Sequence, residues 1–163
     1  METRDQVEVQ LEMLEKCLAC KQELLKKIYQ VTREQEAALD TVPFLEEVFE
    51  ATLSSKEELI TLLGKYDQGF DQIFAKIKEP VSSQKERYKE HIQKMQQMIL
   101  TVTNQGVKIQ ALEQQNKVKL EIYLNSKKQE IKQFKVNNRT VTNYYKTMSA
   151  AGRGESYFKD KKR

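Results

Sequence analysis

The chain has 163 residues and a formal net charge of +4, with 32% charged and 39% hydrophobic residues, which suits one ordinary domain. No apolar stretch approaches the roughly 20 residues that cross a bilayer. The first residues also lack the basic-then-apolar pattern of a signal peptide. We therefore expect a soluble, cytoplasmic protein with no membrane span.

Charge and composition both favour a helical bundle. Residues 1–58 carry 7 Lys or Arg against 14 Asp or Glu, whereas residues 59–136 carry 14 against 8 and residues 137–163 carry 7 against 2. An acidic first segment and a basic later one suit packing side by side. Only five Gly and two Pro interrupt a chain rich in Glu, Lys, Gln and Leu, which are good helix formers.

The first helix is predicted over residues 4–39. Thr3-Arg4-Asp5-Gln6 fits a capping box, in which the Thr and Gln side chains bond to free backbone N–H groups. Apolar residues then recur at helical spacing in two adjacent stripes, which predicts a wide buried face. The stripes consist of Val7, Leu11, Leu14, Leu18, Leu25 and Ile28, and of Cys17, Leu24, Val31 and Ala38.

The second helix is predicted over residues 43–78, because Pro43 is tolerated in a first turn. Its apolar residues alternate gaps of four and three, a spacing typical of coiled-coil-like packing. They are Leu59, Leu63, Tyr66, Phe70, Ile73 and Ile77. Residues 54–58 are an alternative helix start. The pattern continues back to Phe49, Leu45 and Val42 without a phase change, which favours one helix.

The third helix is predicted over residues 84–136. Residues 79–83 contain Pro80 and are predicted to form a loop, and Ser83-Gln84-Lys85-Glu86 fits a second capping box. Apolar residues recur along the helix, and no Pro follows before residue 136. They are Tyr88, Ile92, Met95, Ile99, Val102, Ile109, Leu112, Leu120, Tyr123, Leu124, Ile131 and Phe134.

These elements predict an all-α fold, an elongated antiparallel three-helix bundle or coiled coil, in a single domain over residues 1–136. At 1.5 Å per residue the helices would be about 54, 54 and 78 Å long, so the third would project about 24 Å beyond the others from near Leu120. The overhang would expose a protein-binding stripe of Leu120, Tyr123, Leu124, Ile131 and Phe134. Residues 137–163 are expected to form a flexible, basic tail that contains aromatic residues.

We expect neither an enzyme nor a cofactor, because few residues could perform chemistry. Cys17-Leu18-Ala19-Cys20 is one CxxC on a helix, and His91 is the single histidine, whereas a zinc site needs three or four ligands. No glycine-rich phosphate loop occurs. The basic end of the chain, Lys159-Asp160-Lys161-Lys162-Arg163, carries too few charges to indicate nucleic-acid binding.

Two stretches of the chain resemble the FlgN-type flagellar export chaperones. They are Lys21-Gln22-Glu23-Leu24-Leu25 and Ser55-Lys56-Glu57-Glu58-Leu59-Ile60-Thr61-Leu62-Leu63-Gly64-Lys65-Tyr66-Asp67-Gln68-Gly69-Phe70, the second being similar to the family's Lys-Glu-(Glu/x)-Leu-Ile…Leu-Asp…Phe segment. The long third helix followed by a Tyr-containing tail is also similar to that family. The chain departs from it in a longer insert over residues 39–54.

The resemblance implies a cytosolic chaperone of the flagellar type III secretion system. Members bind C-terminal helical segments of hook-associated (hook–filament junction) proteins, prevent premature assembly and deliver them to the export gate. The stripe from Leu120 to Phe134 would then bind cargo, and Tyr144 and Tyr145 would engage the gate. Two alternatives remain open: a chaperone of the filament cap protein, and a structural coiled-coil protein that forms a homodimer through the third-helix stripe.

Overall fold

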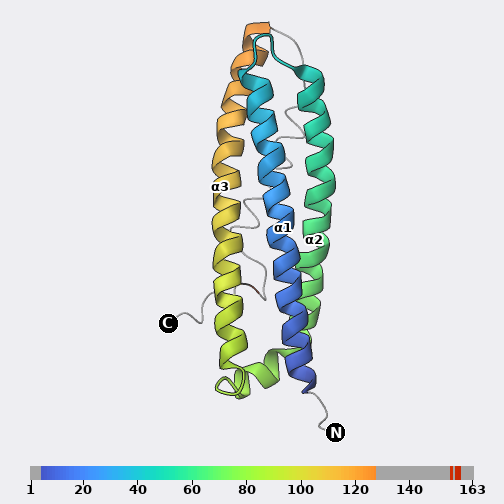
Figure 1. Ribbon diagram of the computed structural model, residues 1–163, viewed down its shortest axis with the longest axis vertical. Coiled ribbons are helices and arrows are strands. Elements are labelled where there is room, and N and C mark those ends of the chain that lie inside the picture. The colour runs from blue at the N-terminus through green and yellow to red at the C-terminus, as the bar shows by residue number, and fades with distance from the viewer. Residues whose placement is uncertain (1–4, 128–154, 156, 159–163) are drawn as a thin grey trace.

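The protein is a bundle of three long helices. The computed structural model describes residues 5–127, 155, 157 and 158. Helices α1 (Gln6–Asp40), α2 (Glu46–Ser83) and α3 (Lys89–Lys127) run up, down and up along one long axis (Figure 1). The predicted all-α, elongated, antiparallel three-helix bundle is confirmed. No described helix is both long enough and apolar enough to cross a membrane.

Helix α1 is the central element of the bundle. It packs against both α2 and α3, whereas no Cα atom of α2 lies within 8 Å of one in α3 among the described residues. The two neighbouring apolar stripes of α1 explain this arrangement, because a wide apolar face can cover two partners at once. Leu14, Leu18 and Leu25 from the first stripe are buried, and so is Leu24 from the second.

Helix α1 begins at Gln6, with Asp5 as its N-cap. The Asp5 carboxylate accepts a hydrogen bond from the backbone N–H of Val7 at 3.0 Å. The same carboxylate accepts one from the Tyr88 hydroxyl at 2.8 Å and pairs with Arg87 at 3.0 Å. The capping box predicted from Thr3 to Gln6 is therefore wrong. Asp5 is favoured as the cap because Tyr88 and Arg87 of the α2–α3 connection also bind its carboxylate. Local sequence rules cannot detect these distant partners.

Helix α2 is continuous through Ser54, which confirms the expectation of one helix rather than two. It also continues through Pro80 to Ser83, so the loop predicted over residues 79–83 is wrong. The Pro80 ring removes one backbone hydrogen bond near the end of the helix. Ile77 and Val81, one turn apart, are both fully buried on the face toward the core, and this burial offsets the loss.

Helix α3 begins at Lys89 rather than at residue 84, because residues 84–88 form the connection from α2. Helices α1 and α2 are 35 and 38 residues long. The part of α3 as far as Leu124 lies beside them, because Leu120 and Leu124 pack in one cluster with Ala38 of α1 and Phe49 of α2. The predicted overhang from Leu120 is wrong.

The core is divided along the bundle axis into two apolar clusters. The larger lies in the lower half, toward the α2–α3 connection, and the smaller lies at the upper end, toward the α1–α2 connection (Figure 1). The smaller cluster consists of Ala38, Phe49, Leu53, Leu120 and Leu124. Between the two lies a buried polar layer formed by Thr32, Gln35, Lys56, Glu113 and Asn116.

Candidate binding groove between α2 and α3

The apolar stripe near the end of α3 is part of the core. Leu120 and Leu124 are 1% and 5% exposed and pack in the upper cluster. Tyr123 is half-buried; its ring centroid lies 4.4 Å from that of Phe44, and its hydroxyl donates a hydrogen bond to the Glu46 carboxylate. The expectation that these three residues are exposed is therefore wrong.

The other residues predicted to bind cargo or the export gate are Ile131, Phe134, Tyr144 and Tyr145. All four lie outside the described residues.

A different surface of the bundle holds a polypeptide segment. In the lower half, three residues from near the end of the sequence, Glu155, Tyr157 and Phe158, lie against the helices; we call them the docked segment. Phe158 contacts α2 through Phe70 and Phe74, with ring centroids 6.2 and 5.3 Å away. It also contacts α3 through its backbone carbonyl. We call the surface that receives this segment the α2–α3 groove.

The phenyl ring of Phe158 is the most deeply buried part of the docked segment. Its exposed fraction is 0%, and it meets Phe70 and Phe74 at interplanar angles of 85° and 69°. Such edge-to-face geometry is the preferred arrangement of aromatic pairs. The expectation of a flexible tail is therefore wrong at the docked segment. The signal for this docking in the sequence was the pairing of two aromatic residues, Tyr157 and Phe158, within a polar, basic stretch.

A buried lysine fixes the acidic end of the docked segment. The Lys21 ammonium nitrogen on α1 lies 2.8 Å from Glu155 Oε2 and 2.6 Å from Asp67 Oδ1 on α2. Burial acts to lower the pKa of Lys21, but the two carboxylates outweigh it and leave that pKa above its usual value. Burial raises the pKa of the Glu155 carboxyl, and the Lys21 charge opposes this rise.

Polar side chains hold the remaining part of the docked segment. Gln96 on α3 donates its side-chain N–H to the backbone oxygen of Phe158 at 3.2 Å. The hydroxyls of Ser82 and Tyr157 lie 2.8 Å apart, and the Tyr157 ring centroid lies 5.1 Å from that of Phe74. Residues of all three helices therefore contact the segment.

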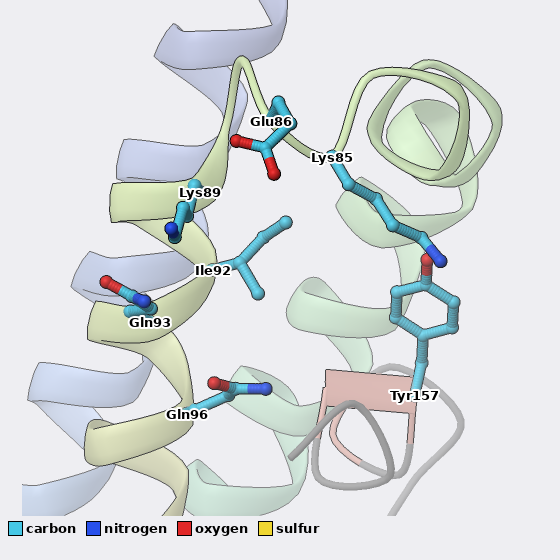
Figure 2. A pocket seen from close by; sticks show the side chains of 7 residues that line it. All are labelled: Lys85, Glu86, Lys89, Ile92, Gln93, Gln96 and Tyr157. Carbon is cyan, nitrogen blue, oxygen red and sulfur yellow. The ribbon is translucent and has the colours of Figure 1, made fainter. Parts of the chain in front are cut away.

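A cavity of about 380 Å³ lies beside Tyr157. Figure 2 shows Ile92, Gln93 and Gln96 of α3 on one side and the ring of Tyr157 across from them. Lys85 and Glu86 of the α2–α3 connection and Lys89 at the start of α3 complete the lining. This mixture of an apolar side chain with amide and charged groups suits a peptide better than a small apolar ligand.

The cysteines and the histidine lie elsewhere on the bundle. Cys17 and Cys20 are both free thiols, and burial raises the pKa of the Cys17 thiol, which packs against the larger cluster. His91 is partly buried, with Nδ1 3.0 Å from a Glu15 carboxylate oxygen. Within the described residues, no group of three His, Cys, Asp or Glu side chains is placed to hold a metal ion.

No protein-family model, curated protein or solved structure matches this chain. We therefore assign the class of this protein from its fold and its groove. It is a three-helix bundle in which residues of all three helices hold a short segment of polypeptide.

Proposed function

We infer that the chain is a binding protein without catalytic activity, and specifically a cytoplasmic flagellar export chaperone. It holds a C-terminal helical segment of a hook–filament junction protein, prevents premature assembly and delivers that protein to the export gate. One observation carries this inference: the α2–α3 groove accepts a polypeptide segment that is remote in sequence from its walls. Such binding requires no cofactor.

The resemblance to the FlgN-type chaperones bears on the same groove. Lys21 belongs to the first resembling stretch, and Asp67 and Phe70 belong to the second. Lys21 and Phe70 contact the docked segment directly, and Asp67 pairs with Lys21. The residues that carry the resemblance therefore include residues that form the groove, which supports a common role in cargo binding.

The groove suits the class of cargo that such a chaperone protects. Amphipathic segments that fold only on assembly expose apolar side chains, and a hydrophobic groove between helices can cover one face of them. The homodimer alternative is less well supported, because Leu120 and Leu124 of the stripe that would carry it are already buried within the chain.

The test is a titration of labelled C-terminal cargo segments, from hook–filament junction proteins and from a filament cap protein, against the full chain. The chain carries Phe158→Ala, so that its own phenylalanine does not compete for the groove. We expect a junction-protein segment to bind. Adding Ile92→Glu, which places a carboxylate in the groove wall, should weaken binding at least about tenfold.

Ile122→Glu is the matched control, because Ile122 lies on the same helix and is 64% exposed outside the groove. It should leave the affinity unchanged. Equal weakening by both substitutions would place the cargo site elsewhere. Binding of the cap segment alone would identify the filament cap protein, rather than a junction protein, as the cargo. Binding of neither segment would refute the chaperone function.

A further inference from the structure

The α2–α3 groove recognises three separate features of the docked segment. Phe70 and Phe74 enclose an aromatic ring, the Lys21 ammonium meets a carboxylate, and the Gln96 amide binds a backbone carbonyl. The backbone contact accepts any residue, so the ring and the carboxylate provide the selectivity. In the chain these two groups are three residues apart, in Glu155-Ser156-Tyr157-Phe158.

Lys21 occupies a position where the bundle otherwise requires an apolar side chain. It lies seven residues after Leu14 and seven before Ile28, both of which are fully buried on α1. Lys21 is itself only 3% exposed. A lysine at such a position costs stability unless carboxylates pair with it, and here Asp67 of α2 and Glu155 of the docked segment both do so, which places a binding position for a carboxylate in the groove.

The docked segment can leave the groove without leaving the buried Lys21 ammonium unpaired. Asp67 Oδ1 lies 2.6 Å from the Lys21 ammonium, its side chain is 32% exposed to solvent, and it belongs to α2 rather than to the docked segment, so it remains available as a partner when Glu155 departs. Lys21 and Asp67 then form a neutral pair, which avoids the large cost of a buried unpaired lysine. Exchange of one occupant for another is therefore energetically accessible.

A longer occupant would gain contacts that the docked segment does not make. The cavity of about 380 Å³ continues from Tyr157 toward the α2–α3 connection and is left open by the described residues. An occupant on the same chain has an effective concentration on the order of millimolar, so a competitor must bind more strongly to displace it. The contacts available in this cavity supply that advantage.

We propose that the α2–α3 groove is a docking site for a partner segment with a carboxylate three residues before a phenylalanine and an aromatic residue directly before that phenylalanine. Glu155, Tyr157 and Phe158 occupy the site in cis until such a segment displaces them. This inference rests on the proposed function only in placing the partner in the groove. The partner is a protein, and the recognised feature is a short acidic–aromatic motif.

The probe is a fluorescent peptide with the sequence Gly-Glu-Ser-Tyr-Phe-Lys, titrated against the full chain. We expect Phe158→Ala, which weakens the internal occupant, to bind the probe at least about tenfold more tightly than the wild type does. Glu155→Gln keeps the shape of the docked segment but removes its charge, and should also increase binding. It serves as a second test if Phe158→Ala does not fold.

Selectivity for the carboxylate is tested in the Phe158→Ala chain. Replacing Glu by Gln in the peptide should weaken binding about tenfold, and Lys21→Met in the protein should abolish the difference between the two peptides. Equal probe affinity for wild type and both tail variants overturns the proposal. A wild-type dimer that Phe158→Ala converts to a monomer also overturns it, since a second copy would then be the occupant. No flagellar protein is used, so this result is independent of cargo binding.

Discussion

At the scale of single residues, Asp5 joins two parts of the chain that are remote in sequence. It caps α1 and also accepts a hydrogen bond from Tyr88 in the α2–α3 connection. This bond is the main reason that the pKa of Asp5 lies below its ordinary value of 3.8, with smaller contributions from Val7 and Arg87. Burial, and then the bond to Asp5, raises the pKa of Tyr88 above 10.0.

The two pKa shifts predict how Tyr88→Phe depends on pH. Because the pKa of Asp5 is lowered in the folded state, the stability that its carboxylate contributes is present above pH 3.8 and is lost as pH falls through the lowered value. Because the pKa of Tyr88 is raised, its contribution is present below pH 10.0 and is lost as pH rises through the raised value. The stability difference between wild type and Tyr88→Phe should be largest between these limits.

Urea unfolding at about pH 3, 7 and 11 measures this dependence. The difference in unfolding free energy should be smaller at both extremes than at neutral pH. Tyr29→Phe is the control, because Tyr29 is partly buried against the same apolar cluster that contains Tyr88. A difference for Tyr88→Phe that stays constant from pH 3 to 7 would show that the bond to Asp5 does not stabilise the fold.

At the scale of helices, the buried polar layer sets the alignment of all three elements. Lys56 on α2 contacts the Glu113 carboxylate on α3, and its ammonium donates to Gln35 Oε1 on α1 at 2.7 Å. Lys56 is completely buried, and this burial lowers its pKa. A polar residue at a core position of a helical bundle costs stability but specifies one register, as in coiled coils.

Removing one partner of the Lys56–Glu113 pair should lower the unfolding free energy more than replacing both partners does. Lys56→Met leaves the Glu113 carboxyl buried without its main partner, and should lower the unfolding free energy by about 3–5 kcal/mol. The double variant Lys56→Met with Glu113→Gln removes both charges, and should recover most of that loss. Denaturant unfolding of the wild type, both single variants and the double variant measures the coupling. A double variant whose loss equals the sum of the two single losses would show that the two charges act independently.

The sequence predicted the elements better than their ends. The apolar periodicity gave three helices, the continuity of α2 through Ser54 and the two-sided face of α1, because burial along a long stripe dominates helix formation. Pro80 suggested a loop by a local rule, but burial of Val81 extends α2 beyond it. The five residues of the connection place the start of α3 later than predicted, and Leu120 and Leu124 consequently pack inside the bundle.

The candidate groove and the buried polar layer could not be predicted from the sequence, because both depend on contacts between distant residues. Lys21 and Lys56 lie at core positions seven residues from apolar neighbours, where periodicity alone treats a lysine as a solvent-exposed break in the stripe. Their carboxylate partners are Glu155 and Glu113, far along the chain. Only the folded structure shows that these lysines are buried and paired.

At the scale of the whole molecule, the two halves of the bundle differ in how α2 and α3 are joined. In the upper half the side chains of the two helices meet directly, through Lys56 with Glu113 and through Tyr123 with Glu46. In the lower half the docked segment lies against both helices instead. The upper half is therefore a closed structural core, and the lower half is the part that can exchange one occupant for another.

This division predicts that the α3 stripe and the groove respond differently to mutation. Leu120→Ala and Leu124→Ala each remove a buried side chain from the upper cluster, and should each lower the unfolding free energy by about 2–5 kcal/mol. Neither should change the affinity of the groove for the Glu-Ser-Tyr-Phe peptide, because the groove lies in the lower half. Ile122→Ala, at a 64% exposed position between them, should change neither quantity.

Denaturant unfolding and peptide titration on the same three variants separate the two roles. Unchanged stability with weakened peptide binding would instead make the stripe a binding surface, as helix lengths estimated from the sequence had suggested.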